Sequence, residues 1–321
     1  MKKTALYTLC FVAAATASTA FAQQYPTKPV RFVVPFAPGG PSDIAARMLG
    51  DKLSQRLGRQ FIIDNRPGAN GNIGMELVAK APPDGYTIII TSVGTWAVNP
   101  NLYVAPFDVT RDFAPIVLVA TAAAILAVHP SVPAKSVKDL IMLARARPGQ
   151  LNYGSAGVGA IGHISGELFG LMTGTRMVHI PYKSSAPALT DLLTGQIEVL
   201  FNNAISTVPF VKSGQVRALA VTSLKRIQAL PDLPTVDEAG VKGYDTSSWS
   251  AIGTTAGTPK EIITKLNKEL NQILKLPDIQ EKYAAGGAYV IGGTPEQFAD
   301  YLKSEIAKFA RVVREARISA Q

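Results

Sequence analysis

Residues 30–49, VRFVVPFAPGGPSDIAARML, join an apolar run, a group of prolines and glycines, and the start of a helical pattern. The apolar run is typical of a strand that is buried on both faces. Ser42 or Asp43 can cap the helix, while Gly39 and Gly40 permit positive φ angles and leave main-chain N–H groups open to a ligand. Since a helix start carries partial positive charge, this order of elements predicts either an ordinary turn or an anion site.

The first residues have the features of an export signal. Lys2 and Lys3 precede a short apolar segment, and Ala20–Ala22 fits a small-x-small cleavage pattern. We therefore expect a Sec-type signal peptide over residues 1–22, cleaved after Ala22, and a mature protein in the periplasm. Cys10, the only cysteine, lies in that segment, so the exported part would have neither disulfides nor thiol chemistry.

The composition limits the classes of partner. The chain has 32 basic and 23 acidic residues, and the basic residues are spread along it with no run of three. Because no stripe of arginines and aromatic residues is present, we expect no nucleic-acid partner. A chain of 321 residues can bury a sufficient core without disulfides and usually divides into two domains.

Beyond the expected signal peptide, apolar runs of strand length alternate with helical patterns. Repeated strand-helix-strand units predict an α/β fold with parallel-rich sheets flanked by helices. The predicted strands are Val30–Pro35, Phe61–Ile63, Thr87–Ser92, Ile125–Val128, Leu151–Gly154, Arg176–Ile180, Glu198–Phe201 and Arg217–Thr222. The predicted helices are Ser42–Leu57, Asn72–Lys80, Val137–Ala146, Ile161–Thr173, Ala186–Leu193, Val208–Lys212, Lys260–Leu276 and Glu296–Arg317.

The alternation breaks twice, at Asp112–Val128 and at Ser223–Gly257. The first break is a long β-like stretch without a helix, and the second is rich in proline and glycine. Both predict places where the chain crosses between domains. The expected first domain is discontinuous, residues 23–124 plus 224–321, and the second is residues 125–223. Two α/β lobes joined by two crossing strands enclose a cleft of the kind in which ligands bind.

Four strand-to-helix turns, two in each expected domain, are rich in glycine and hydroxyl residues. They are residues 35–43, 91–100 (TSVGTWAVNP), 153–167 (YGSAGVGAIGHISGE) and 180–189 (IPYKSSAPAL). Parallel sheets place such turns at one edge, so the turns of two facing lobes would line the cleft with backbone donors and hydroxyl groups.

Gly157–Gly162 reads G-x-G-x-x-G between a predicted strand and a predicted helix, as in dinucleotide-binding domains. That function also requires an acidic residue about 20 positions later, at the end of the next strand, to hold the ribose. The next predicted strand ends in HIPYK, residues 179–183, without Asp or Glu. We therefore expect no cofactor and assign the motif to acid binding.

Catalytic and metal-binding patterns are scarce. No G-x-S-x-G nucleophile elbow is present, and His129, His163 and His179 have neither metal-ligand spacing nor an accompanying cysteine. We therefore expect no catalytic residues, no metal and no enzyme activity. An exported α/β hydrolase and a nucleotide-binding oxidoreductase stay open as alternatives. His163 either donates to a bound anion or serves as a core or capping residue.

Eight short segments, taken in order, resemble those of the periplasmic solute receptors of tripartite tricarboxylate transporters, the Bug family, over essentially the whole mature chain. They are PFAPGGPSD (35–43), NRPGANGNIG (65–74), PDGYT (83–87), NPNLY (99–103), NYGSAGVGAIGH (152–163), HIPYK (179–183), LPDLPTVDEAG (230–240) and TPKEIITKLN (258–267). Trp96 stands in a turn where the family usually has smaller or His-like residues, so it is expected to alter the size of the pocket.

The resemblance implies a two-lobe periplasmic binding protein, or Venus flytrap, which captures a small carboxylate for a tripartite tricarboxylate-type membrane transporter or for a sensor. The protein is expected to be a monomer, since closure needs two free lobes. The loop after the first strand would approach one carboxylate of the ligand through main-chain groups and water. The candidate ligand-binding residues are Phe36, Ala37, Gly39, Gly40, Asp43, Ser92, Gly94, Thr95, Ser155, Ala156, Gly159, His163, Tyr182 and Asn202.

Overall fold

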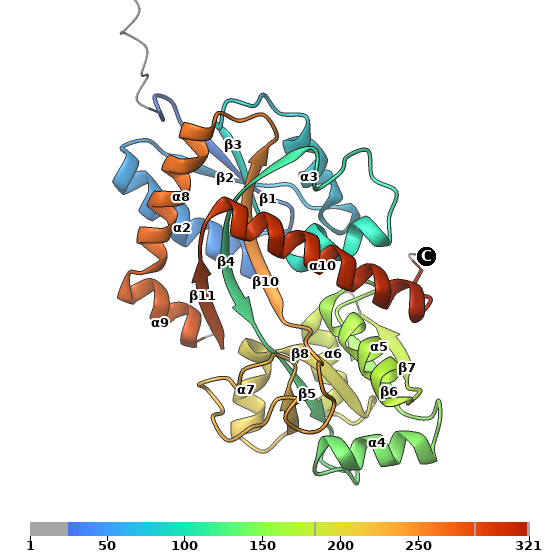
Figure 1. Ribbon diagram of the computed structural model, residues 1–321. Helices are drawn as coiled ribbons and strands as arrows, with labels where there is room; N and C mark the ends of the chain where they lie inside the picture. Colours follow the sequence, from blue (N-terminus) through green and yellow to red (C-terminus); the bar gives the residue numbers. More distant parts are fainter. Residues whose placement is uncertain (1–24, 183, 286, 320–321) are drawn as a thin grey trace, which may run out of the picture.

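Two β-sheets lie one above the other along the long axis of the protein, each flanked by helices (Figure 1). The structure is a computed structural model and describes residues 25–182, 184–285 and 287–319. The expected signal peptide, with its cleavage site and Cys10, lies outside the described residues. The two-lobe α/β architecture predicted from the sequence is confirmed.

The sheet of the first lobe has the strand order β11-β4-β10-β3-β1-β2. Strand β1 pairs in parallel with β2 and β3, whereas β10 is antiparallel to β3 and β4, and β11 is antiparallel to β4. The strands are β1 (Val30–Val34), β2 (Phe61–Asn65), β3 (Thr87–Ser92), β4 (Phe113–Ala122), β10 (Ser248–Thr255) and β11 (Ala288–Gly292).

The sheet of the second lobe has the order β7-β6-β8-β5-β9. Strand β6 pairs in parallel with β7 and β8, and β5 is antiparallel to β8 and β9. The strands are β5 (Ala124–Val128), β6 (Asn152–Ser155), β7 (Val178–Pro181), β8 (Val199–Asn203) and β9 (Arg217–Val221).

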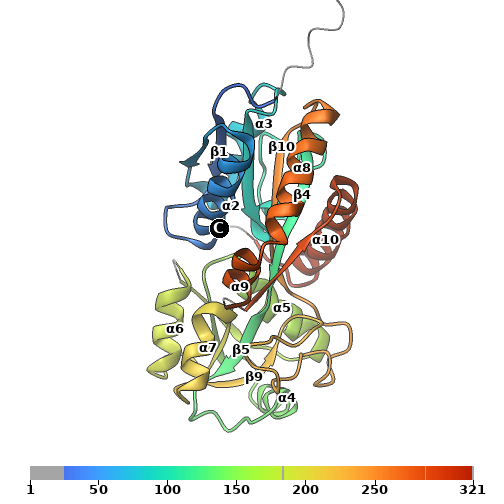
Figure 2. The ribbon, with the colours of Figure 1, turned by 90° about the vertical axis from the view of Figure 1, so that its left-hand side faces the viewer.

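Helices cover both faces of the first sheet (Figure 2). One core cluster joins that sheet to α2 and α8, and another joins it to α3 and α10, because each helix turns an apolar stripe toward the strands. The helices are α2 (Pro41–Leu57), α3 (Asn72–Ala79), α4 (Val137–Ala146), α5 (Ile161–Thr173), α6 (Ser185–Leu193), α7 (Ala204–Lys212), α8 (Lys260–Leu274), α9 (Pro277–Ala285) and α10 (Pro295–Glu315), with short turns η2 (Ala69–Gly71), η3 (Gly94–Val98) and η4 (Asn99–Asn101).

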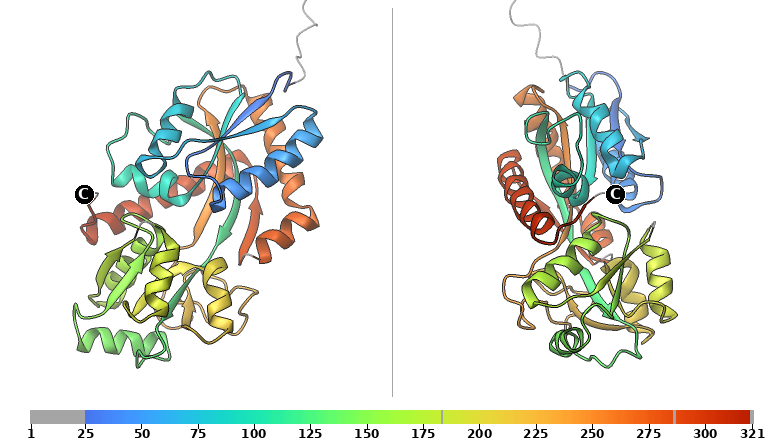
Figure 3. Two further views of the ribbon diagram at one scale, coloured as in Figure 1. Left: turned by 180° about the vertical axis from the view of Figure 1, so that it is seen from behind. Right: turned by 90° about the vertical axis from the view of Figure 1, so that its right-hand side faces the viewer.

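The expectation of parallel-rich sheets was wrong, because both sheets are mixed. The chain runs from the first lobe into the second along β4 and β5 and returns along β10, as seen from behind in Figure 3. A returning strand that pairs with an outgoing one must be antiparallel to it. Strands β10 and β11 and helix α9 had not been predicted.

The outgoing crossing is short and is hydrogen-bonded to the returning segment. Only Ala123 separates β4 from β5. At this point the Thr222 hydroxyl accepts a hydrogen bond from the Ala124 amide (3.0 Å), and the Thr222 carbonyl accepts one from the Thr246 amide (3.1 Å). Thr222 is fully buried. The crossings are therefore a hydrogen-bonded unit rather than a flexible linker.

The returning segment stays with the second lobe for longer than the sequence suggested. After β9, Ile227, Val236, Val241 and Tyr244 pack into the core clusters of the second sheet. The chain enters the first sheet only at Ser248, where β10 begins. We therefore propose a return crossing near residue 247 rather than near 223.

The lobes also touch away from the crossings. A Cβ atom at Gly287, in the turn before β11, would lie 3.0 Å from the Cβ of Ala204 at the start of α7. A Cβ atom at Gly159 would lie 2.7 Å from the Leu102 side chain, which follows η4. Within the described ranges, no helix combines the length and the apolar character that a membrane crossing requires.

Candidate functional site

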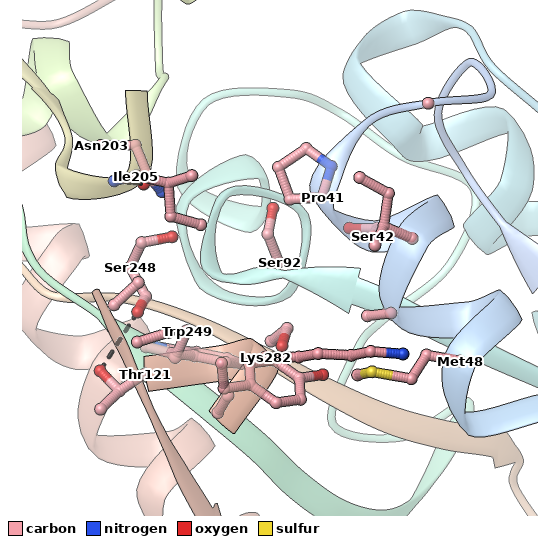
Figure 4. Close-up of a pocket in the computed structure, with 18 residues that line it drawn as sticks. Pro41, Ser42, Met48, Ser92, Thr121, Asn203, Ile205, Ser248, Trp249 and Lys282 are labelled. Atoms are coloured by element: carbon pink, nitrogen blue, oxygen red, sulfur yellow. Dashed lines mark hydrogen bonds between the residues drawn. The ribbon is translucent and has the colours of Figure 1, made fainter. Parts of the chain in front are cut away.

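A cavity of about 470 Å³ lies between the lobes, beside the crossing strands (Figure 4). Helix α2 and strand β3 form one wall, the crossing strands form the base, and α7, α9 and β11 form the remaining walls. The cavity is lined by Gly39, Pro41, Ser42, Ile44, Ala45, Met48, Ser92, Ala120, Thr121, Ala122, Asn203, Ile205, Ser248, Trp249, Ser250, Lys282, Tyr283 and Ala288.

The turn between β1 and α2 is fixed by Asp43. Its carboxylate accepts hydrogen bonds from the Gly39 amide (2.9 Å), the Arg47 guanidinium (2.9 and 3.0 Å) and the Asn65 side chain (3.0 Å). Asn65 also donates to the Phe36 carbonyl (3.0 Å). The hydrogen bond from Arg47 is the largest cause that lowers the pKa of Asp43 to about 2. The Asp43 carboxylate therefore holds the turn, and its oxygens are already occupied by protein donors.

The start of α2 offers main-chain donors to the cavity. No side chain caps the helix, and its first helical residue is Pro41. Gly39 has a φ angle of +84° and needs a glycine, whereas Gly40 is extended, with a φ angle of −78°. Ser42 and Gly39 line the cavity. An uncapped helix start with nearby glycines can bind an anion without an arginine.

The turn after β3 contributes one predicted residue to the cavity. Ser92, the last residue of β3, lines it. Thr95 is buried. A Cβ atom added at Gly71 would lie 2.8 Å from the Thr95 hydroxyl oxygen, so this hydroxyl packs against the Gly71 backbone. Gly94 and Thr95 therefore belong to η3 and do not line the cavity.

Trp96 does not alter the cavity. The indole is 1% exposed and packs edge-on against Phe113 (5.3 Å between ring centroids) and Phe298 (5.7 Å). The expectation that Trp96 changes the size of the pocket was wrong, because η3 turns the side chain into the core of the first lobe.

The glycine-rich loop of the second lobe is held from within. The Ser155 hydroxyl accepts a hydrogen bond from the Gly157 amide (3.1 Å) and contacts His179 Nε2 (2.7 Å), and the Gly159 amide donates to His163 Nδ1 (3.1 Å). Gly157 and Gly159 have φ angles of +128° and +77°. Serine and histidine thus shape the loop, and none of these residues lines the 470 Å³ cavity.

The two histidines of this cluster are stacked, with ring centroids 3.8 Å apart and planes inclined by 7°. Burial lowers the pKa of His163 to about 3 and that of His179 to about 4, so both rings are neutral at pH 7. Glu167 Oε1 lies 3.9 Å from His163 Nε2 and accepts a hydrogen bond from the Tyr153 hydroxyl (2.5 Å). His163 in this structure is an acceptor for the loop rather than a charged donor.

We expect acid to destabilise this cluster. Both folded-state pKa values lie below the ordinary value of 6.5, so the unfolded chain binds more protons as the pH falls. The stability that the two neutral histidines contribute is fully present above pH 6.5 and is lost as the pH falls toward 4. Denaturant unfolding between pH 7.5 and 4.5 should show a smaller loss for His179→Gln than for the wild type. His129→Gln, outside the cluster, is the control, and equal losses in all three proteins would contradict the prediction.

Tyr182 and Asn202 use their polar groups within the second lobe. The Tyr182 hydroxyl donates to Asp191 (2.6 Å), and the Asn202 amide donates to Ser206 and Thr207 (3.2 Å each). The next residue, Asn203, lines the cavity instead and caps α7 by accepting a hydrogen bond from the Ile205 amide (2.9 Å). Figure 4 shows Asn203 and Ile205 on the opposite side of the cavity from Ser42.

Of the predicted set, the cavity therefore brings together Gly39 and Ser92, with Gly40 and Asp43 in the same turn as Gly39. Ala156, beside the loop of Ser155, is half-buried, and Ala37 is exposed. Six lining residues had not been predicted: Thr121, Ser248, Trp249 and Ser250 on the crossing strands, and Lys282 and Tyr283 on α9. The alternation of small polar and apolar residues in SWSAIGTT was a signal that could have identified β10.

The chain matches one family model over most of its length. Residues 45–318 match the tripartite tricarboxylate transporter family receptor, TctC. Among curated proteins, BugT of Bordetella pertussis is 36% identical over 308 residues, which cover 95% of this chain and 94% of BugT. A protein of Pseudomonas sp. strain P51, described as a UPF0065 protein in the tcbD-tcbE intergenic region, is 38% identical over 312 residues, 96% of this chain and 93% of that protein.

Solved structures agree with the sequence matches. The R. palustris protein Rpa4515, solved with adipate, is 42% identical with a TM-score of 0.82, and the alignment covers 92% of this chain and 99% of that one. The periplasmic binding protein BugD is 36% identical with a TM-score of 0.78, and the alignment covers 92% of this chain and 100% of BugD. MatC from Rhodopseudomonas palustris, with bound malate, is 29% identical with a TM-score of 0.78, and the alignment covers 90% of this chain and 100% of MatC. The chain is a member of the tripartite tricarboxylate transporter receptor family, to which the Bug proteins belong.

Proposed function

We propose that the protein is an exported periplasmic receptor that captures a small organic acid between its lobes. It would present this ligand to a tripartite tricarboxylate-type transporter in the membrane, or to a sensor. The observation that carries the proposal is the cavity of about 470 Å³, to which both lobes and the crossing strands contribute. Ligands commonly bind in such a position between two α/β lobes.

The chemistry of the cavity favours a carboxylate. The uncapped start of α2 presents main-chain donors and partial positive charge, and Ser42, Ser92 and Ser248 add hydroxyl groups. Apolar residues, including Ile44 and Met48, supply much of the remaining wall. Two relatives were solved with the carboxylates adipate and malate, which supports the same ligand class here.

Within this proposal the predicted residues divide into two roles. Phe36, Ala37, Gly39 and Gly40 form the turn that approaches one carboxylate, and Asp43 keeps that turn in place through the Gly39 amide. The proposed second-lobe contacts are Ser155, Ala156, Gly159, His163, Tyr182 and Asn202, with Ser92, Gly94 and Thr95 from the first lobe. Asn203 is a further candidate because it lines the cavity.

Binding without turnover is the outcome expected of a receptor. Isothermal titration calorimetry of the mature protein against a panel of mono-, di- and tricarboxylates should give saturable binding to a monomer, with one ligand per chain. The same samples are followed by NMR for ligand consumption, and nicotinamide dinucleotides are included in the panel. Turnover of a ligand would favour the hydrolase, and micromolar dinucleotide binding would favour the oxidoreductase.

We expect ligand binding to close the lobes about the two crossings. The short connection at Ala123 and the network around Thr222 leave a hinge as the simplest relative motion. Small-angle X-ray scattering should show a smaller radius of gyration with a saturating acid than without it. An unchanged radius of gyration at saturation would contradict hinge closure while leaving the binding result intact.

A further inference from the structure

A second cavity lies at the crossing strands, on the face of the first sheet that α10 covers. Its volume is about 430 Å³, and its lining includes Thr121, Ser247, Tyr289 and Tyr301. Helix α2, which lines the 470 Å³ cavity, packs on the opposite face of the same sheet (Figure 2). On β11, Ala288 lines the 470 Å³ cavity and its neighbour Tyr289 lines the second one, because successive side chains of a strand alternate in direction. The crossing strands thus separate a front cavity, of 470 Å³, from a rear cavity, of 430 Å³.

Tyr289 connects the two lobes at the rear cavity. Its backbone pairs with Thr121 in the first sheet, while its ring packs against a core cluster of the second lobe. The Tyr289 hydroxyl donates a hydrogen bond to the Arg226 carbonyl (2.6 Å) and accepts one from the Gln228 amide (3.1 Å). Both partners belong to the segment after β9, which packs with the second sheet through Ile227. We call the two hydrogen bonds of the Tyr289 hydroxyl the rear contact.

The segment that receives Tyr289 is fixed to the second lobe. The Arg226 guanidinium donates to Glu238 (2.8 Å), and the same carboxylate accepts a hydrogen bond from the Thr235 amide (2.9 Å). Thr235 in turn forms a β-bridge with Val221 of β9. The rear contact is therefore anchored in both lobes. A change in the angle between the lobes has to change the distances from the Tyr289 hydroxyl to its two partners.

The front cavity leaves room for the lobes to approach each other. Ile44 of α2 is 60% exposed and Ile205 of α7 is 49% exposed, and both line this cavity from different lobes. An approach of the lobes would remove apolar surface of both side chains from water, which is favourable. Because the crossing strands lie between the two cavities, a rotation about them that narrows the front cavity widens the rear one. That rotation moves Tyr289 away from Arg226 and Gln228.

We propose that the rear contact opposes closure of the lobes, because its two hydrogen bonds form in the open arrangement and break when the front cavity closes. This inference goes beyond the proposed function, since it concerns the equilibrium between open and closed lobes in the protein without a ligand. An interaction that exists in one of two states shifts the equilibrium toward that state. Removing the Tyr289 hydroxyl then favours the closed arrangement.

The test uses Tyr289→Phe, which keeps the ring and removes both hydrogen bonds. Cys10, the only cysteine, lies in the expected signal peptide, so the mature chain carries spin labels only at introduced cysteines. Gln55→Cys on α2 and Lys212→Cys on α7 place labels at exposed positions of the two lobes. Double electron-electron resonance without a ligand should give a shorter mean distance between the labels in Tyr289→Phe than in the wild type.

Acid binding supplies an independent readout. Calorimetry with the tightest-binding acid of the panel should show affinity about twofold to tenfold higher for Tyr289→Phe, because closure no longer breaks the two hydrogen bonds. A general loss of structure would weaken binding instead, so the direction of the change separates the two causes. The melting temperature of each variant is measured alongside.

Tyr301→Phe is the matched control. It removes a hydroxyl from the same rear cavity, and no hydrogen bond among the described residues joins that hydroxyl to the second lobe; the Tyr301 ring packs on Trp249 (5.5 Å between centroids). Its label distance and affinity should equal those of the wild type. An unchanged or longer label distance in Tyr289→Phe, or the same shortening in Tyr301→Phe, would overturn the proposal. If the wild type binds no organic acid, the proposed function fails, and the label distances still decide on the rear contact.

Discussion

Gly40→Val is expected to weaken acid binding more than tenfold while leaving the fold intact. Gly40 has an extended backbone with a φ angle of −78°, which valine adopts readily. A Cβ atom at this position would meet nothing nearer than the Ala37 carbonyl oxygen, 3.7 Å away. The added methyl groups would stand at the start of α2 and keep a carboxylate from the main-chain donors. Two or three such charge-assisted hydrogen bonds, each contributing about 1.5–3 kcal/mol, would be lost or lengthened.

Calorimetry with the tightest-binding acid measures this effect, and the melting temperature without ligand verifies that the variant folds. Arg47→Gln is the informative comparison. Arg47 donates its hydrogen bonds to Asp43 at 2.9 and 3.0 Å, so it acts on the turn rather than on the ligand. Arg47→Gln should therefore weaken acid binding less than Gly40→Val does. Abolished binding in Arg47→Gln together with normal binding in Gly40→Val would show that the turn does not hold the carboxylate.

Glu305→Ala is expected to lower the free energy of unfolding by about 2–3 kcal/mol, because it leaves the buried indole N–H of Trp249 without an acceptor and Lys308 without its partner. The Glu305 side chain is buried. Its carboxylate accepts a hydrogen bond from Trp249 Nε1 (2.8 Å) and forms an ion pair with Lys308 (2.6 Å). The substitution leaves the indole N–H of Trp249 without its acceptor. Because Trp249 lies on β10 and is among the residues that line the cavity, this contact connects α10 to the proposed ligand site.

Two further variants on α10 separate the causes. Glu305→Gln keeps an acceptor for Trp249 and should cost about 1–2 kcal/mol. Glu315→Ala removes an exposed pair with Arg311 on the same helix and should cost less than about 1 kcal/mol. Urea denaturation at pH 7 measures all three free energies of unfolding. If Glu305→Ala cost no more than Glu315→Ala, the buried contact with Trp249 would not stabilise the fold.

The elements that the sequence predicted well are those with a strong local pattern. Val137–Ala146 and Ile161–Thr173 were predicted with their observed bounds, because apolar residues recur at helical spacing, Ser136 caps the start of the first helix and Gly174 follows the second. Thr87–Ser92 was also predicted with its observed bounds, since a run of isoleucines between turn residues is typical of a buried strand. Strand β10 was missed because the alternation in SWSAIGTT is short and lies within a segment rich in proline and glycine.

The site was harder to predict than the fold, because a turn can be identified without knowing which of its groups face the cavity. Asn202 and Asn203 are neighbours on β8, where successive side chains point to opposite faces. A strand assignment that is wrong by one residue therefore exchanges the inward and the outward residue. Asp43 was predicted as a helix cap or a ligand-binding residue, yet its carboxylate does not cap α2 and instead binds Arg47, from a later helical turn, and Asn65, from β2. Lys282 and Tyr283 were missed with α9.

The connection through Ala123 has a thermodynamic consequence for ligand capture. Because a single residue joins β4 to β5 and Thr222 is hydrogen-bonded to both neighbouring segments, few backbone torsions are free to change between an open and a closed arrangement. Ordering a long linker would cost about 1–2 kcal/mol of backbone entropy per residue, which subtracts from affinity. Closure about these crossings orders no such linker. The backbone entropy lost on closure would therefore subtract little from the affinity of the proposed ligand.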